Sequence, residues 1–455
     1  MRNLVQLLLL ISALIFAQSG VAKEELQQSL DDYFGTLYKA DMPGAVVLVA
    51  KEGEILLHQA YGLANVEHQI PLTTDMHFRI ASLTKQFTTT AALKLHQNGE
   101  IDVNDPITKY LPGYPTHGQN ITIEHLATNR SGIPDYVFFE GFLGKDDIQP
   151  KTLDQLIAYF SSEPLEFEPN EKQQYSSSNF IVLGKLIEVV SAQSYENYLK
   201  ETFFEPLGMN STAYGRHETI MPGRVNGYAL KDEELINAPY ISMTVPHAAG
   251  ALRSTTMDLY RWQRGLIDGA VLPEELLELA WSRKTMNDGY TSNYAYGWNV
   301  GEIGSLKSLS HSGGIPGFST FAAFLPEQDV HVIILSNFPE AVDDSLINIA
   351  GKAILMALDK PTSPAKQAVH KGLLTTLPGE YQFGESFSAT IIKSGDTLQM
   401  KFPWEEKASP LYFADKNSVY FDDSWSTFRL LPQDNPRGDI VLQYWNGARI
   451  YGHRL

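Results

Sequence analysis

The sequence contains no cysteine among its 455 residues. This absence excludes disulfide bonds, thiol nucleophiles, thiolate-bound zinc, iron–sulfur clusters and a lipid anchor on an N-terminal cysteine. A covalent catalyst in this chain would therefore be a serine, threonine, lysine, tyrosine or carboxylate side chain.

The sequence also lacks a dense stripe of basic residues. Its 35 Lys and Arg residues are outnumbered by 53 Asp and Glu residues, which gives a formal net charge of −18. A surface of that sign repels phosphate backbones, so we expect no nucleic-acid partner. Hydrophobic residues make up 43% of the chain and charged residues 19%, which is typical of a globular protein with a sizeable core.

Long apolar runs are absent except at the N-terminus. Arg2 precedes the run at residues 4–16 (LVQLLLLISALIF), and small residues follow as far as Ala22. This pattern predicts a secretory signal peptide over residues 1–22, with cleavage after Ala22 or, alternatively, after Ala17. The run is short for a membrane span of about 20 residues. We therefore expect a periplasmic or secreted protein with no stable membrane anchor after cleavage.

Residues 23–360 mix strand-like and helix-like segments. A hairpin is expected from residues 44–50 and 55–57 across a glycine-containing turn, and a strand pair from residues 318–325 and 329–336. Helices are expected at residues 83–97, 153–160, 180–193, 195–203, 256–268 and 344–358. Strands at both ends with helices between them predict an α/β (α+β) fold, in which helices cover one antiparallel sheet.

The pattern changes towards the C-terminus. Prolines and small polar residues indicate a linker over residues 361–372. Within residues 373–455, short aromatic and β-branched segments are separated by turn signals such as Asn446-Gly447. This region is predicted to be a small antiparallel β-barrel or sandwich, with strands at residues 388–393, 397–402, 418–421 and 440–445.

The first motif with chemical meaning is residues 82–85 (SLTK). On a helix, residues three apart share a face, so the Lys85 amine can lie beside the Ser82 hydroxyl and assist its deprotonation. A helix N-terminus also directs backbone N–H groups, that of Ser82 among them, at a developing oxyanion. The pattern alone is weak, because a second match occurs at residues 363–366 (SPAK) in the expected linker.

Two further motifs strengthen the first. Tyr175 opens the segment Tyr-Ser-Ser at residues 175–177, and a tyrosine near Lys85 can serve as general base and then general acid. The segment 311–314 (HSGG) places adjacent glycines on an expected strand. Such a strand lets a substrate approach closely and offers the Gly314 N–H as a second oxyanion donor.

With these motifs in this order, the sequence resembles the serine β-lactamase and penicillin-binding protein superfamily, in its class C β-lactamase-like branch. That branch includes D-alanyl-D-alanine carboxypeptidases, D-amino-acid-specific peptidases and esterases. The resemblance runs from about Gly44 to Leu358. It includes the segments 121–126 (ITIEHL), 131–136 (SGIPDY), 206–209 (PLGM) and 250–258. The C-terminal region resembles the lipocalin-like β domain appended to many such hydrolases.

The resemblance implies a role for each motif. Ser82 is implied as the acyl-enzyme nucleophile, Lys85 as its proton partner and Tyr175 as the general base and acid. The segment beginning at His311 is implied as the counterpart of the family's Lys-Thr-Gly strand. Ser177, Ser312 and Gly313 are then expected to bind substrate.

Two departures from the family pattern bear on the substrate. Ser177 stands where the family usually has asparagine, and a hydroxyl reproduces only part of an amide's hydrogen bonding. His311 stands where β-lactamases have lysine, and a histidine of ordinary pKa is mostly neutral at pH 7. A permanent cation suits the carboxylate of β-lactams and of D-Ala-D-Ala, so we expect little β-lactam turnover.

Structural roles compete with some of these assignments. Ser177 and Asn179 would be ordinary caps for a helix that begins near Phe180. His311 could be a structural hydrogen-bonding residue. His117, His125 and His247 show no metal-ligand spacing, so structural roles are expected for them. The sequence has no Gly-x-Ser-x-Gly elbow, phosphate loop, dinucleotide fingerprint or His-Glu-x-x-His helix.

The function predicted from the sequence is an exported serine hydrolase that forms a Ser82 acyl-enzyme with small esters or with peptide amides, D-amino-acid amides included. No metal or organic cofactor is expected, and the predicted partner is a small-molecule or peptide substrate. A D-alanyl-D-alanine carboxypeptidase or a β-lactamase stays an alternative. So does a catalytically weak protein that binds cell-wall ligands. The oligomeric state is not indicated.

Overall fold

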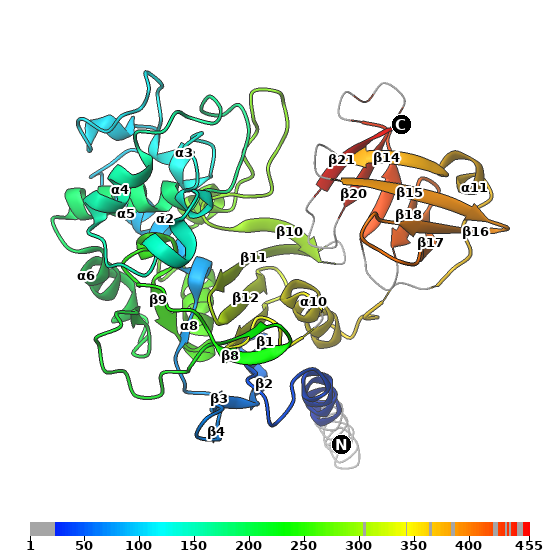
Figure 1. Cartoon of the computed structure of the whole chain (residues 1–455), viewed down its shortest axis with the longest axis horizontal. Helices are drawn as coiled ribbons and strands as arrows, with labels where there is room; N and C mark the ends of the chain where they lie inside the picture. The colour runs from blue at the N-terminus through cyan, green and yellow to red at the C-terminus, as the bar shows by residue number, and fades with distance from the viewer. Residues whose placement is uncertain are drawn as a thin grey trace, which may run out of the picture. The chain divides into compact units, whose positions relative to one another are not determined.

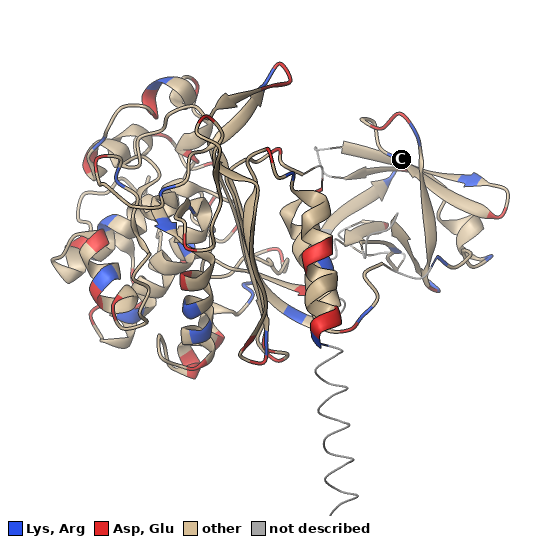
Figure 2. Ribbon diagram, turned by 90° about the horizontal axis from the view of Figure 1, so that it is seen from below, with Lys and Arg blue, Asp and Glu red and all other residues tan. Residues whose placement is uncertain are grey.

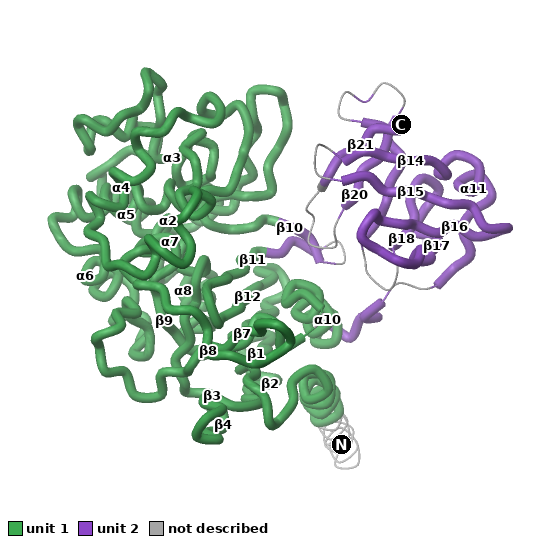
Figure 3. The backbone as a smooth tube through the Cα atoms, viewed as in Figure 1, with its two compact units in different colours: residues 1–300, 309–357 green, residues 301–308, 358–455 purple. Residues whose placement is uncertain are grey.

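The computed structural model describes residues 23–303, 306–342, 344–363, 366–383, 387–421, 426–432, 435, 438–443 and 449–455. They belong to two compact units (Figure 3). One holds the chain up to Val300 together with Leu309–Ala357, and the other holds Gly301–Ser308 together with Leu358–Leu455. The expected signal peptide and the Asn446-Gly447 turn lie outside the described residues.

A six-stranded sheet forms the centre of the first unit. Its order is β10-β11-β12-β13-β1-β2, and β1 pairs antiparallel with both β2 and β13. The N-terminal hairpin therefore joins a sheet whose other strands come from the far end of this unit, as when Ala45 pairs with Ser336. This confirms the predicted antiparallel sheet built from distant segments. The strands are β1 (Ala45–Lys51), β2 (Glu54–Tyr61), β10 (Asn299–Ile303), β11 (Leu306–Ile315), β12 (Phe318–Leu325) and β13 (Val330–Ser336).

Helices cover both faces of this sheet. Every residue of β13 is buried, which requires cover on each side because successive side chains point to opposite faces. Figure 2 shows the sheet edge-on, with the helix at residues 23–37 on one side and most other helices across from it. The helices of the first unit are α2 (Thr84–Gln97), α3 (Ile123–Ala127), α4 (Leu153–Phe160), α5 (Ser177–Ser191), α6 (Tyr195–Leu199), α7 (His247–Gly250), α8 (Thr256–Ile267), α9 (Glu274–Ala280) and α10 (Leu346–Ala357).

Short elements connect these helices (Figure 1). The single turns are η1 (Ala81–Leu83), η2 (Ile107–Lys109), η3 (Tyr136–Phe138), η4 (Phe142–Asp146) and η5 (Lys200–Phe204). The short strands are β3 (Leu63–Asn65), β4 (Ile70–Pro71), β5 (Phe78–Arg79), β6 (Ala213–Tyr214), β7 (Tyr228–Lys231), β8 (Glu234–Asn237) and β9 (Leu252–Ser254). They form the small sheets β3-β4, β5-β9-β6 and β7-β8.

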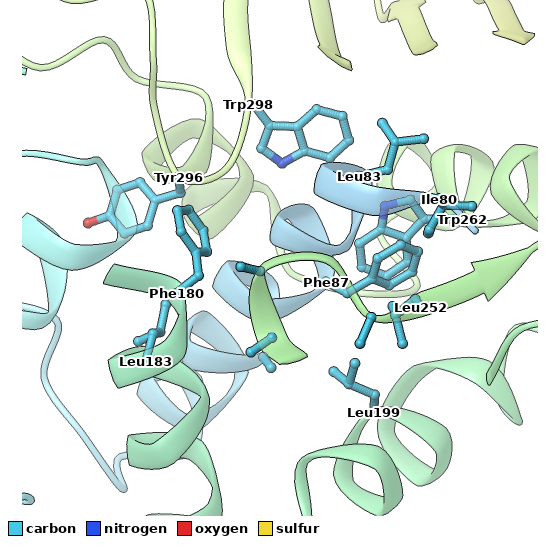
Figure 4. Packing of buried hydrophobic residues seen from close by; sticks show 14 of the residues in the cluster. Ile80, Leu83, Phe87, Phe180, Leu183, Leu199, Leu252, Trp262, Tyr296 and Trp298 are labelled. Atoms are coloured by element: carbon cyan, nitrogen blue, oxygen red, sulfur yellow. The ribbon is translucent and has the colours of Figure 1, made fainter. Parts of the chain in front are cut away.

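Helix α2 runs through the core rather than along the surface. Phe87 stacks on Trp262 of α8 at a centroid distance of 4.2 Å, and Leu83 and Leu252 lie close by (Figure 4). Burying such a ring stabilises the fold by about 2 kcal/mol. Two buried hydroxyls of α2 donate to backbone carbonyls of other segments, Thr88 to Ala248 O at 2.6 Å and Thr89 to Tyr296 O at 2.7 Å. This packing holds the N-terminus of α2 in place.

The second unit contains a closed eight-stranded barrel, so the expected barrel or sandwich is a barrel. Strand β16 alternates exposed and buried residues, and eight strands leave an interior that side chains fill. Val369, within the segment expected to be a linker, is buried in this core. The elements are α11 (Leu373–Thr376), β14 (Gly379–Phe383), β15 (Phe387–Ser394), β16 (Thr397–Lys401), β17 (Ser409–Asp415), β18 (Ser418–Phe421), β19 (Thr427–Leu430), β20 (Ile440–Gln443) and β21 (Arg449–Arg454).

Because each unit has its own hydrophobic cluster, we expect a chain truncated after Lys360 to fold and to keep Ser82 reactive. The measurement is covalent labelling by a serine-directed phosphonate, followed by mass spectrometry. Limited proteolysis of the full chain should cut among the exposed residues 359–363. A truncated chain with native circular dichroism that fails to label would show that the barrel contributes to reactivity.

Candidate active site

Ser82 and Lys85 lie where η1 joins α2. Lys85 Nζ donates to Ser82 Oγ at 3.0 Å and to the carbonyl oxygen of Ala249 at 2.9 Å. Ala81, just before the serine, has a φ of 47°, a left-handed conformation that costs free energy for a residue with a side chain and is typical of functional turns. The structure thus brings the two residues of the first motif into direct contact.

Lys85 is buried among aromatic rings. Its side chain is 1% exposed, and Nζ lies 4.8 Å from the centroid of the Tyr175 ring and 5.1 Å from that of Phe180. Burial lowers the pKa of Lys85 from 10.5 to about 7, against the opposing effect of the Asp135 carboxylate. A large share of the amine is therefore unprotonated at neutral pH and able to accept a proton.

Asp135 supplies the negative charge that faces this lysine. It is buried and caps η3, with its carboxylate accepting the Val137 N–H at 3.2 Å. Burial raises the pKa of Asp135, while the backbone N–H groups of Ser177 and Val137 and the charge of Lys85 favour its ionised form. Asp135 lies within the segment 131–136 that carries the family resemblance, but nothing in its spacing indicated a role beside Lys85.

A buried amide network fixes the loop that carries Tyr175. The side-chain oxygen of Asn129 accepts the Ser176 N–H at 3.1 Å and the Asn179 amide at 2.9 Å. The backbone carbonyl of Asn129 accepts the Gln174 N–H at 3.0 Å. Hydrogen bonds on both sides of Tyr175 therefore set its backbone.

The Tyr175 side chain extends from solvent to Ser82. The residue is 38% exposed, yet its hydroxyl end lies inside the site. Burial raises the pKa of Tyr175, and a hydrogen bond with Ser82 and the charge of Asp135 act on it more weakly, in opposite directions. The phenol therefore stays protonated at neutral pH.

His311 is a buried neutral imidazole. Nδ1 lies 2.5 Å from the carbonyl oxygen of Ser312, which can only accept, so Nδ1 carries the proton. Nε2 then accepts the Tyr294 hydroxyl at 3.1 Å. Burial, aided by the charge of Lys85, lowers the pKa of His311 to about 3. Both ring nitrogens are engaged, so the side chain acts on the site through these partners.

The glycines after His311 differ in their surroundings. A Cβ on Gly313 would lie 2.3 Å from Thr320 Oγ1 and 2.5 Å from Ile80 O, so only glycine lets β11 pass this close to η1. A Cβ on Gly314 would meet nothing within 4 Å. Ser312 and Gly314 are exposed on the strand, whereas His311 and Gly313 are buried. Strand β11 thus has one open side, at Ser312 and Gly314.

Helix α5 begins earlier than the sequence predicted. It starts at Ser177, and its N-cap, Ser176, makes no side-chain cap hydrogen bond. The alternative in which Ser177 and Asn179 cap a helix beginning near Phe180 is therefore wrong. The Ser177 N–H instead donates to Asp135, and the Asn179 oxygen accepts the Ser131 hydroxyl.

His117, His125 and His247 make contacts of the kind that structural histidines make. His125 completes the capping box of α3, His117 faces the Ser161 carbonyl, and His247 packs between the rings of Tyr195 and Tyr214. In the part of the chain that the structure describes, no group of three His, Asp or Glu residues could hold a metal ion. No helix in those same residues is long and apolar enough to span a bilayer.

Tyr294 is a site residue that sequence reasoning missed. Its ring meets that of Tyr175 edge-on at 5.7 Å, and its hydroxyl binds His311. It lies more than 100 residues from the Tyr175 motif and in no recognised pattern. Only the folded chain shows that it joins the second and third motifs.

Comparison with known proteins agrees with this arrangement. A family model described as Beta-lactamase matches residues 24–354. Penicillin-binding protein 4* of Bacillus subtilis (strain 168) is 30% identical over 405 residues, which cover 83% of this chain and 88% of that protein.

Two solved structures share the fold. The octameric penicillin-binding protein homologue from Pyrococcus abyssi has a TM-score of 0.64 at 23% identity and covers 94% of this chain and 99% of its own. The D-amino acid amidase from Ochrobactrum anthropi SV3, complexed with D-phenylalanine, has a TM-score of 0.63 at 23% identity and covers 73% and 99% respectively.

The charge of Asp135 raises the Lys85 pKa, so Asp135→Asn should lower it. If unprotonated Lys85 is the base, kcat/KM should rise with pH through about 7 in the wild type. The variant should shift that acidic limb to lower pH by about one unit. Rate–pH profiles on an uncharged ester measure this.

The matched control is Asp154→Asn, because the Asp154 side chain is 77% exposed and pairs with Lys185 on the surface. Its profile should coincide with that of the wild type. A shift of the Asp135→Asn limb to higher pH would contradict the electrostatic role of Asp135.

Proposed function

This chain belongs to the beta-lactamase family of serine hydrolases, and from that membership we propose that it hydrolyses small esters or peptide amides through a Ser82 acyl-enzyme. The observation that carries the proposal is the buried Lys85 amine, which lies 3.0 Å from Ser82 Oγ and has a pKa near 7. An isolated serine is a poor nucleophile, and a neutral amine at hydrogen-bond distance is the base that activates it.

In acylation, Ser82 Oγ forms a bond to the substrate carbonyl carbon while Lys85 accepts the hydroxyl proton. The bond from the carbonyl carbon to the leaving oxygen or nitrogen then breaks, Tyr175 gives its proton to that leaving group, and Lys85 returns a proton to Tyr175. Its raised pKa supports this assignment as an acid, because a phenol that stays protonated is a proton donor. In deacylation, water attacks the acyl carbon and gives a proton to Lys85. The bond between the acyl carbon and Ser82 Oγ then breaks, Lys85 returns that proton to Oγ, and the acid product leaves.

We place the oxyanion between the backbone N–H groups of Ser82 and Gly314. Ser82 lies in the first turn of the η1–α2 segment, where N–H groups lack intrahelical acceptors. Gly314 lies on the exposed side of β11, clear of neighbouring atoms. Such a pair is worth roughly a hundredfold or more in rate for each donor.

The neutral His311 supports uncharged or amine-bearing substrates over carboxylates. Losing one charge-assisted hydrogen bond forfeits about 1.5–3 kcal/mol, or roughly ten- to hundredfold in affinity or rate. A protein named as a D-amino acid amidase shares the fold, which supports D-amino-acid amides among the proposed substrates. The similarity to a protein named as a penicillin-binding protein keeps a D-alanyl-D-alanine carboxypeptidase or a β-lactamase as the alternative.

A catalytically weak protein that binds cell-wall ligands is the remaining alternative. It has no need of a buried amine with a pKa near 7 beside a serine, which speaks against it. Export to the periplasm or outside the cell is part of the proposal and rests on the sequence of residues 1–22.

We expect a fluorophosphonate probe to label Ser82, and Ser82→Ala to abolish both labelling and turnover. Lys85→Ala should lower kcat by several orders of magnitude, because it removes the base. Ser363→Ala is the matched control, since Ser363 belongs to the second Ser-x-x-Lys match, and it should leave both readouts unchanged. Turnover that survives in Ser82→Ala would refute the assignment.

The charge at position 311 should determine how well the site accepts a substrate carboxylate. The wild type should hydrolyse short-chain esters and D-amino-acid amides faster than nitrocefin. His311→Lys should raise the ratio of nitrocefin to ester acylation by about tenfold or more, because it adds a cation. His311→Gln, a neutral control, should leave that ratio unchanged. A wild type that acylates with nitrocefin as fast as with esters would favour a β-lactamase.

A further inference from the structure

Two arginines face each other across a short strand pair behind the nucleophile. Arg79 of β5 is the direct register partner of Arg253 of β9, and opposite residues of an antiparallel pair project from the same face. Both guanidinium groups lie against the ring of Phe318, at 5.8 and 6.0 Å from its centroid. Arg253 is 4% exposed and Arg79 is 8% exposed.

Among the residues that the structure describes, no carboxylate pairs with either arginine. Nε of Arg79 and both Nε and Nη1 of Arg253 are buried without a hydrogen-bond partner among the described residues. A third cation, Arg224, acts electrostatically on both arginines. Its backbone forms a β-bridge with His77, which lies two residues before Arg79. Burial lowers the pKa of Arg253 to about 9 and that of Arg79 to about 10, which leaves both protonated at neutral pH.

Two other arginines of the same unit form ion pairs with carboxylates. The buried Arg130 pairs with Glu124 at 2.6 Å, and Arg264 pairs with both Asp268 and Asp329. A buried charge without a partner is strongly unfavourable. Its donors are therefore suited to an external anion, and a guanidinium is well adapted to hold a carboxylate or phosphate by two parallel hydrogen bonds.

We propose that Arg79 and Arg253, with the exposed Arg224 at their side, form a binding site for an oxyanion of the carboxylate or phosphate class. The anion comes either as a free ion or as the carboxylate of a substrate. It would neutralise the pair and supply acceptors to the unpartnered guanidinium nitrogens.

The site adjoins the elements that hold the catalytic residues. Arg79 is separated from Ser82 by Ile80, whose carbonyl accepts the Thr320 hydroxyl at 3.0 Å, and by the strained Ala81. Arg253 follows α7, whose Ala249 carbonyl binds Lys85. An anion bound here would therefore brace η1 and α7 as well as the two strands.

The direct test is thermal unfolding of the full chain with inorganic phosphate, at constant ionic strength set by sodium chloride. Phosphate should raise the Tm saturably, because a ligand of the folded state stabilises it by mass action. Arg253→Gln and Arg79→Gln should each weaken phosphate binding by about tenfold or more. Arg253→Gln should also have a higher Tm than the wild type without phosphate, since it removes a buried unpaired cation.

Two further variants keep the test decisive. Arg224→Gln changes an exposed side chain, so it folds whatever happens to the buried pair, and it should still weaken phosphate binding. Arg264→Gln, at an arginine with two carboxylate partners, should bind phosphate as the wild type does. A wild type without saturable stabilisation, or equal stabilisation in all four variants, would overturn the proposal.

Kinetics separate the two sources of the anion. If a substrate carboxylate occupies the site, phosphate will inhibit competitively with a carboxylate-bearing ester and not with its amide-capped analogue, and Arg79→Gln will raise KM for the first alone. If the site takes a free anion, neither substrate will show competition. The binding measurement uses no turnover, so failure of the proposed hydrolysis leaves it intact.

Discussion

The burial of one amine, that of Lys85, governs the structure around Ser82. Taking an ammonium group out of water is costly, and Lys85 meets that cost by partial loss of its proton and by hydrogen bonds to Ser82 and to the Ala249 carbonyl. These contacts need close packing of the surrounding backbone. The backbone at Gly297 approaches that of Lys85 so closely that a Cβ on Gly297 would lie 2.7 Å from the Lys85 carbonyl oxygen.

The histidine of the third motif follows the same constraint. A lysine at position 311 would place a second cation beside Lys85, whereas the neutral ring of His311 adds no charge and still fills the space. Its two nitrogens are saturated by Ser312 O and the Tyr294 hydroxyl. The site thereby keeps a single titrating cation, and Asp135 is the acid that faces it.

Periodicity and turn signals predicted the elements whose boundaries are local. Helix α4 and strand β12 begin and end where the sequence placed them, because Thr152 caps the helix and Gly317 turns the strand. The start of α5 was not predicted correctly, because serine and asparagine are residue types that often cap helices. In the folded chain, Ser177 and Asn179 instead form hydrogen bonds with Asp135 and Asn129, which are distant in sequence. The roles of Tyr294 and Asp135 could not be predicted from the sequence for the same reason, because they depend on which segments the sheet brings together.

Lysine and arginine respond to burial in different ways, and the first unit contains both cases. Lys85 can release its proton and become a base, so its burial leads to chemistry. A guanidinium keeps its proton in proteins, so Arg79 and Arg253 remain charged wherever the fold puts them. The arginines cannot become neutral by losing a proton, so a partner of opposite charge must neutralise them. Because Arg79 lies three residues before Ser82 and pairs across the strands with Arg253, the charge state of the arginines and the geometry of Ser82 belong to one structural unit.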